Sequence, residues 1–273
     1  MDDAASVKVD LLTFASEIAC SARISALKMT SAAKTSHIGA CLSVIDILAT
    51  LFTLKHRETS NLSNNVILSK GHAAAALYSV LDNMGLLESG LSDYCVNGSQ
   101  LYGHINHHAS AEIPLSTGSL GHGLPFGIGM ALASKLKGIK SQTYVVISDG
   151  ELNEGTTWES ALVAGHRRLN NLTVIVDRNR IQSLGFTEEI NKLDPIAPKW
   201  EAFDWETVEV DGHDIGAMIK ILGVQYERPL CIIANTVKGK GVSFMENTLE
   251  WHYQSPTPEQ LVAAIQEVSE KRS

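Results

Sequence analysis

The chain contains 273 residues, of which 44% are hydrophobic and 19% are charged. This composition supports a sizeable buried core and excludes an intrinsically disordered chain, and the length fits one large domain or two small ones. The 22 lysine and arginine residues are outnumbered by 30 aspartate and glutamate residues, which leaves a formal net charge of −8. An acidic chain without a basic stripe is not typical of a nucleic-acid-binding protein. We therefore expect no nucleic-acid partner.

The cysteines and the N-terminal sequence favour a reducing compartment. Cys20, Cys41, Cys95 and Cys231 form no Cys-x-x-Cys pair, so their spacing fits neither a zinc site nor a disulfide framework. We expect them to be small core residues. The acidic start of the chain lacks the features of a signal peptide, and no apolar run approaches the roughly 20 residues of a membrane span. We expect a cytoplasmic protein with no membrane partner.

The first half of the chain is dominated by helical periodicity. Alanine, leucine and isoleucine recur at helical spacing, and one short apolar run has the pattern of a buried strand. A polar stretch that contains glycines follows, and after it comes a helix with small residues. In chain order, we predict helices at about 9–34 and 43–54, a strand at 65–69, a helix at 73–84, a loop-rich segment at 89–112 and a helix at 124–136.

The second half alternates strands and helices regularly. Two β-branched runs flank an amphipathic segment over the length of a βαβ unit, which requires parallel strands and a right-handed crossover. In chain order, we predict a strand at 143–147, a helix at 154–169, strands at 172–176 and 206–210, a helix at 215–224 and a strand at 230–235. Because no linker or repeat divides the chain, we predict one three-layer α/β domain with a mainly parallel sheet flanked by helices.

The last predicted helix, at 257–271, carries a clear start signal. Thr257 can cap the N-terminus of this helix, and Pro258 suits the first helical position. Gln260 stands three residues after the threonine and can complete a capping box. The local sequence therefore predicts where this helix begins.

Polar side chains follow two neighbouring strands of the predicted sheet. Asp149 and Gly150 end the first strand of the βαβ unit, and Asn179 follows the second strand. Ligands of open parallel sheets bind at the carboxyl ends of the strands, where these side chains would meet. A carboxylate and an amide oxygen suit Mg²⁺, and nearby helix N-termini suit a diphosphate. An ordinary Asp-Gly turn explains the same spacing, and the pattern alone leaves both interpretations open.

Four motifs in order give this chain a family resemblance. They are SKGHAAAALY at 69–78, STGSLGHGLPFGIGMA at 116–131, the βαβ segment that opens with SDGELNEG and closes with DRNRIQS at 148–183, and TVKGKG at 236–241. The third resembles the thiamine diphosphate motif of transketolases, and the other three resemble transketolase segments in the order of that family. The resemblance extends from about His37 to His252. It is strongest to the N-terminal half of split transketolases, in which two chains make one enzyme.

The resemblance implies cofactor and metal sites. Asp149 and Asn179, with the Ile181 carbonyl, would hold Mg²⁺, and Gly150 would let the diphosphate approach closely. The positions that it assigns to thiamine diphosphate are His72, Gly118, Ser119, Leu120, Gly150, Glu151, Asn179, Lys238 and His252.

The resemblance also implies catalytic roles for His37, His104 and His252. The first two would line the substrate channel, bond to ketose hydroxyls and move protons. Three positions depart from the family pattern, namely Ser148, His122 and Tyr253. Separately from the resemblance, the His-x-x-His-His spacing at 104–108 leaves a zinc cluster as an alternative, although no cysteine or carboxylate stands nearby. For His213 we have no chemical role, and capping of a strand end is as good an interpretation.

The resemblance implies that part of the enzyme lies on another chain. In the family, a pyrimidine-binding domain follows the domain seen here and carries a glutamate that activates the cofactor. We expect residues 1–273 to form only the diphosphate-side domain, inactive without a C-terminal transketolase subunit that supplies the pyrimidine-binding and C-terminal domains, in an α₂β₂ assembly. A fragment of a longer enzyme is the alternative; Met1 and the capped last helix favour a complete subunit.

The expected reaction is transfer of a two-carbon ketol unit from a ketose phosphate to an aldose. Three alternatives stay open. The first is a transketolase-like enzyme of specialised sugar biosynthesis. The second is an enzyme like 1-deoxyxylulose-5-phosphate synthase, which uses a single longer chain. The third is a non-catalytic module that binds the cofactor and regulates a partner.

Overall fold

Five parallel strands form the central sheet of the computed structural model, which describes residues 2–57 and 64–270, with side chains from residue 10 onward. The strand order is β1-β2-β3-β5-β4, and every neighbouring pair is parallel. This confirms the predicted α/β fold with a parallel sheet. The strands are β1 (Asn65–Leu68), β2 (Thr143–Ser148), β3 (Leu172–Arg178), β4 (Glu206–Asp211) and β5 (Leu230–Asn235).

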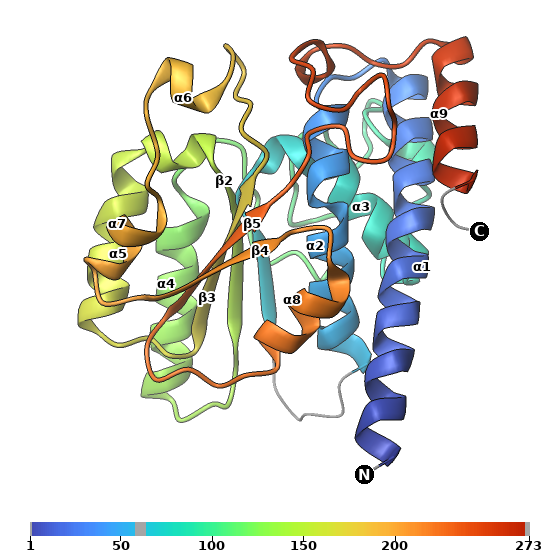
Figure 1. Ribbon diagram of the computed structural model, residues 1–273. Helices are drawn as coiled ribbons and strands as arrows, with labels where there is room; N and C mark the ends of the chain where they lie inside the picture. Colours follow the sequence, from blue (N-terminus) through green and yellow to red (C-terminus); the bar gives the residue numbers. More distant parts are fainter. Residues whose placement is uncertain (1, 58–63, 271–273) are drawn as a thin grey trace.

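Helices cover both faces of this sheet (Figure 1). α1, α2, α3 and α8 lie on one face, and α4, α5 and α7 lie on the other. The helices are α1 (Asp2–Ala33), α2 (Ile38–Arg57), α3 (Ala74–Asn83), α4 (Gly123–Leu136), α5 (Gly155–His166), α6 (Thr187–Ile190), α7 (Ala197–Glu201), α8 (Ile215–Leu222) and α9 (Pro258–Glu270), with short 3₁₀ turns at Gly71–Ala73, Leu91–Asp93, Gly150–Asn153 and Glu250–His252.

Two hydrophobic cores result from the alternation of side chains along the strands. Along β2, Tyr144 and Val146 pack into the core beside α1, α2 and α3, whereas Val145 and Ile147 pack into the core beside α4 and α5. Both faces are apolar because parallel strands are covered on each side. The strand sequences are therefore continuous apolar runs rather than alternating ones.

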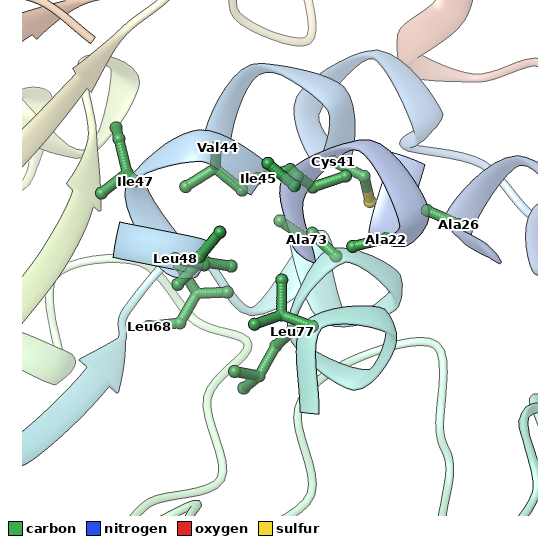
Figure 2. Packing of buried hydrophobic residues seen from close by; sticks show 14 of the residues in the cluster. Ala22, Ala26, Cys41, Val44, Ile45, Ile47, Leu48, Leu68, Ala73 and Leu77 are labelled. Carbon is green, nitrogen blue, oxygen red and sulfur yellow. The ribbon is translucent and has the colours of Figure 1, made fainter. Parts of the chain in front are cut away.

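Small side chains let the N-terminal helices pack closely. Ala22 and Ala26 of α1 face α2 at Cys41 and Ile45, as Figure 2 shows. All four side chains are at most 1% exposed. Because alanine keeps the helix backbones close, α2 is wedged between α1 and the sheet. This position fixes the N-terminal end of α2 at the carboxyl edge of the sheet.

Helix α2 corrects the expectation that no apolar run reaches membrane-span length. Its segment Ile38–His56 has a mean hydropathy of 1.8, and this is the one such segment in the described part of the chain. In the fold, 94% of that segment is buried. A core helix passes the same length and composition test, so the hydropathy is explained by burial between α1 and the sheet.

Most predicted elements are confirmed, with shifted boundaries. The start of α9 is confirmed in detail, since Gln260 N–H donates to Thr257 Oγ1 at 3.3 Å and Thr257 N–H donates to Gln260 Oε1 at 3.0 Å. The short helices α6 and α7 were not predicted. The cysteine prediction is wrong for Cys95, which is exposed, whereas Cys41 and Cys231 are buried. Residue 271, the predicted end of the last helix, lies outside the described residues.

Candidate active site

A cavity of about 260 Å³ opens at the carboxyl edge of the sheet, the upper edge in Figure 1. It forms where the loops after β1, β2, β3 and β5 meet the N-terminal end of α2. The structure brings together here all the predicted site residues except Ser119 and Glu151. The lining residues are His37, Ala40, His72, His104, Gly118, Leu120, Ser148, Asp149, Gly150, Asn179, Ile181, Gln182, Ser183, Lys238 and His252.

Asp149 and Asn179 meet in this cavity because β2 and β3 are paired, with Ser148 opposite Asp177. The Asp149 carboxylate accepts hydrogen bonds from the backbone N–H groups of Gly150 at 2.8 Å and Arg180 at 2.6 Å. Burial, together with the nearby Asp177 charge, raises the pKa of Asp149 to about 7. A cation bound beside this carboxylate would strongly stabilise its charged form.

The oxygen donors in this cavity suit Mg²⁺ and not zinc. Asp149, the side chain of Asn179 and the backbone carbonyl of Ile181 are hard oxygen ligands, and few of them are needed because Mg²⁺ retains water and phosphate oxygens. Within residues 2–57 and 64–270, no three histidine, cysteine, aspartate or glutamate side chains form a group that could hold a metal. The alternative of a zinc cluster at 104–108 is therefore wrong. The donor set and the raised pKa of Asp149 both fit a divalent oxygen-bound cation.

Four histidine rings cluster in the wall of the same cavity. The ring centroid of His37 lies 5.0 Å from that of His252, 5.3 Å from that of His72 and 5.9 Å from that of His104. His37 adopts a left-handed backbone conformation (φ 76°), and its N–H donates to the His252 carbonyl at 3.0 Å. This conformation and the hydrogen bond hold the start of α2 against the turn that carries His252.

Burial keeps several of these rings neutral. Burial, reinforced by the charges of His104 and Lys238, lowers the pKa of His37 to about 4. Burial and Lys238 lower the pKa of His252 to about 3, and burial also lowers the pKa of His72 well below its usual value. At neutral pH these imidazoles are hydrogen-bonding groups without charge.

Lys238 links the histidine wall to the carbonyl of Ile181. Its Nζ donates to His252 Nδ1 at 2.9 Å and to the Ile181 carbonyl at 3.1 Å. Because His252 Nδ1 accepts this bond, the proton of the neutral ring resides on Nε2. Burial and the neighbouring Lys70 lower the pKa of Lys238 to about 8. The cavity thus holds a buried cation that an anionic ligand can neutralise.

Beneath the cavity lies a buried network that sequence reasoning missed. Lys70 forms an ion pair with Asp177, and both side chains are fully buried. Asp177 also accepts hydrogen bonds from Ser43 Oγ at 2.7 Å and from Thr236 Oγ1. The signal was present in the sequence, since an aspartate ends the apolar run of β3 and a lysine follows that of β1. This network ties the loops after β1 and β5, and helix α2, to the end of β3.

The structure corrects the expected place of Glu151. This side chain is fully buried beneath the cavity, where it accepts hydrogen bonds from Ser69 Oγ and from the Gly121 N–H at 2.8 Å. It therefore braces the loop that carries Gly118 and does not line the cavity. Ser119, in the same loop, is exposed and lies outside the cavity lining.

A larger cavity, of about 620 Å³, lies between α1, α8 and α9 and is lined by different residues. At its base, Asp46 pairs with Arg23 and accepts from His213 Nδ1 at 2.7 Å. His213 Nε2 accepts the Val237 N–H at 2.9 Å, which fixes the ring tautomer. Asp46 is thus bonded to both Arg23 and His213, and His213 bridges it to the backbone of Val237, a role that the sequence did not reveal.

Two residues that depart from the family pattern have defined contacts. Tyr253 Oη donates to the Ser183 carbonyl at 2.7 Å, so the tyrosine ties the His252 turn to the loop after β3. His122 is exposed, and its ring nitrogen Nδ1 lies 3.0 Å from the carbonyl of Leu120, outside the cavity lining. Gln182 and Ser183, the last two residues of the motif at 148–183, also line the cavity, although no role was predicted for them.

Comparisons with known proteins agree with this geometry. The family model described as "Transketolase, thiamine diphosphate binding domain" matches residues 14–268. An apulose-4-phosphate transketolase subunit of Actinobacillus succinogenes is 40% identical over 86% of this chain and 88% of its own length. The 6-deoxy-6-sulfo-D-fructose transketolase subunit SqwG of a Clostridium species is 36% identical, covering 86% of this chain and 89% of its own length.

Solved transketolase structures share the fold. The structure of the Campylobacter jejuni transketolase superposes with a TM-score of 0.82 and 24% identity, covering 95% of this chain. The chain spans only 43% of that transketolase and 40% of the Mus musculus transketolase, to which it is 36% identical. The similarity to subunits of about the same length is therefore more complete than the similarity to the long single-chain enzymes.

Proposed function

This chain belongs to the transketolase family, as a thiamine diphosphate binding domain, and we propose that it is the diphosphate-binding subunit of a two-chain transketolase. The observation that carries the proposal is the cavity at the carboxyl edge of the sheet, where oxygen donors and neutral histidines meet. The near-complete match to chains that are themselves named as transketolase subunits supports the division of the enzyme into two chains.

In this proposal the edge of the sheet holds the cofactor and its metal. Asp149, Asn179 and the Ile181 carbonyl would bind Mg²⁺, and Lys238 would face the negative charge of the diphosphate. Leu120 and the backbone at Gly118 and Gly150 line the cavity on the same side. When bound, thiamine diphosphate supplies a nucleophilic carbon that can carry a two-carbon unit.

The histidines would orient the sugar and move its protons. His37 is neutral at pH 7 and lies beside His104 in the cavity wall, so this pair can accept and donate hydrogen bonds to ketose hydroxyls. His252 would present its Nε2 proton, because Lys238 bonds to its Nδ1.

The remaining parts of the enzyme are proposed to lie on a partner. We propose that a second subunit supplies the pyrimidine-binding domain, that the two chains assemble as α₂β₂, and that this chain alone is inactive. The proposed substrates are a ketose phosphate donor and an aldose acceptor. Our proposed compartment is the cytoplasm, which the free state of all four cysteines supports.

A specialised sugar substrate is a second candidate. Three similar chains carry names that include apulose-4-phosphate or 6-deoxy-6-sulfo-D-fructose, which are unusual sugars. The donor and acceptor of this enzyme are therefore to be sought among modified sugars as well as among the ordinary pentose and hexose phosphates.

The test is a reconstitution. The chain is expressed alone and together with the protein encoded beside it, and ketol transfer is assayed with thiamine diphosphate and Mg²⁺ against a panel of sugar phosphates. We expect activity only in the mixture. Turnover by the chain alone would contradict the two-chain proposal. Failure to bind thiamine diphosphate in the mixture, measured by titration calorimetry, would contradict the cofactor assignment.

A further inference from the structure

The imidazole of His252 is held by more than one contact. Lys238 Nζ bonds to His252 Nδ1 at 2.9 Å, which fixes one nitrogen but leaves the ring free to tilt about that bond. Two further rings limit the tilt. The ring centroid of His37 lies 5.0 Å from that of His252 at 87°, and the ring centroid of Tyr253 lies 4.9 Å from it at 66°. Edge-on contacts of this kind favour one relative orientation of the rings.

Tyr253 is itself anchored, although 57% of this residue is exposed. Its Oη donates to the Ser183 carbonyl at 2.7 Å, across 70 positions of the sequence. The loop that accepts this bond is braced, because the Gln182 N–H donates to the Gly185 carbonyl at 2.8 Å. Exposed side chains ordinarily change rotamer within nanoseconds, so a ring that is fixed at its far end has an unusually well-defined position.

Lys238 already joins the two segments that Tyr253 joins. Its Nζ bonds to the Ile181 carbonyl at 3.1 Å as well as to His252, so the loop after β3 and the turn that carries His252 are connected without the tyrosine. A second connection adds little to the joining of these segments. The distinct contribution of Tyr253 is a ring placed against the imidazole.

The tyrosine acts from outside the cavity. His252 and Ser183 line the cavity, whereas Tyr253 does not. Tyr253 therefore influences a bound substrate through the imidazole beside it. The Nε2–H of that imidazole is the donor proposed to face the sugar, and a misplacement of about 1 Å in an active site can lower a rate by about 100-fold.

We propose that Tyr253 is a positioning residue, whose ring, anchored at the Ser183 carbonyl, holds the imidazole of His252 in the orientation in which its Nε2–H meets the substrate. This inference rests on the proposed function, because it takes a sugar in the cavity as the substrate. It gives a role to one of the three positions at which the chain departs from the family pattern.

Two substitutions separate the anchor from the ring. Tyr253→Phe keeps the ring and removes the bond to Ser183, and Tyr253→Ala removes both. The matched control is Tyr226→Phe, which removes a hydroxyl in the loop before β5, at the opposite edge of the sheet. Circular dichroism checks that each variant keeps its fold, and Tyr253→Phe decides the question if Tyr253→Ala does not fold.

The measurement is steady-state ketol transfer by the chain together with its partner, in thiamine diphosphate and Mg²⁺, with calorimetric titration of thiamine diphosphate into the same preparations. We expect Tyr253→Phe to lower kcat by about fivefold and Tyr253→Ala by about 20-fold, because the first loses a hydrogen bond and the second loses a ring contact as well. The KM for the sugars and the Kd for thiamine diphosphate should stay within about twofold of wild type, as should every constant of Tyr226→Phe.

The other outcomes overturn the proposal. If kcat of both Tyr253 variants stays within about twofold of wild type, His252 does not depend on the tyrosine. If the Kd for thiamine diphosphate rises as much as kcat falls, Tyr253 supports cofactor binding through Ser183, and the positioning role is wrong. A wild-type mixture that neither turns over sugars nor binds thiamine diphosphate removes the proposed function and this inference with it. An active wild type with unchanged variants removes this inference alone.

Discussion

Two buried aspartates of this protein are held in different ways. Asp46, at the base of the larger cavity, is bonded to the basic side chains of Arg23 and His213. Burial alone would raise its pKa, but the Arg23 charge and the His213 hydrogen bond outweigh burial and hold that pKa below its usual value. Asp149, in the smaller cavity, accepts from backbone N–H groups, and its pKa is raised to about 7 by burial and Asp177.

The difference separates a structural site from a binding site. At Asp46 the folded chain supplies the positive charge itself, so the cluster is electrostatically complete. At Asp149 the hydrogen bonds come from backbone N–H groups, and burial outweighs the charge of the neighbouring Lys70, so a bound cation would stabilise the carboxylate. If cavity volume were the criterion for the binding site, the choice would fall on the larger, 620 Å³ cavity beside Asp46. In this protein, a buried carboxylate with a raised pKa indicates the candidate binding site better than cavity volume does.

The largest expected effect is the loss of the Asp46 cluster. Asp46→Ala leaves the Arg23 guanidinium buried without its carboxylate, and we expect the free energy of unfolding to fall by about 3–5 kcal/mol. Urea unfolding followed by circular dichroism measures this, with Glu88→Ala as the loss of an exposed carboxylate. If the two variants were equally stable, the Asp46 cluster would not be the structural anchor described here.

The opposite pattern is expected at Asp149. Asp149→Asn removes the only charged side chain of the proposed metal ligands, and we expect the affinity for thiamine diphosphate in Mg²⁺ to fall by about 100-fold or more. The ligand-free chain should change its free energy of unfolding by no more than about 1 kcal/mol, because a costly buried charge is lost together with a hydrogen bond. Calorimetric titration and urea unfolding of one preparation measure both quantities. A variant that unfolds easily yet binds normally would reverse the comparison.

The smallest expected effect is a pH dependence of the stability that Asp46 contributes. The folded-state pKa of Asp46 is below its unfolded value, so its contribution is complete above about pH 4, the ordinary pKa of aspartate, and is lost as the pH falls through the folded value. We expect the stability gap between wild type and Asp46→Ala to be constant from about pH 5 to 7 and to narrow below about pH 4. Urea unfolding at several pH values measures the gap. A gap that widens in acid would contradict the assignment of the charge.

Local sequence signals predicted the fold because each of them acts over a short range. The apolar runs of β2 and β3, and the segment between them, specify a βαβ unit without information from elsewhere. Thr257 and Gln260 specify the start of α9 in the same way. The helices α6 and α7 were missed because Thr187–Ile190 and Ala197–Glu201 are too short to show a helical period.

The sequence predicted those site residues that lie at the ends of strands. Asp149 and Asn179 end adjacent strands, so parallel pairing brings them together. The Asp46 cluster could not be predicted in this way, because Arg23, Asp46 and His213 are far apart in the sequence and meet only through the packing of α1, α2 and the start of α8. The burial of Glu151 depends likewise on the approach of Ser69 and Gly121, which no local pattern contains.

The position of His37 has a consequence for biosynthesis. Its N–H bonds to the carbonyl of His252, and the Gly39 carbonyl accepts from the N–H of Gly239 at 3.0 Å. The start of α2 is therefore completed by residues near the other end of the chain. During translation this wall cannot close until the segment from Gly239 to His252 has emerged from the ribosome. A ligand that needs this wall thus binds only after residues 239–252 have been made, and it cannot guide the folding of the nascent N-terminal helices.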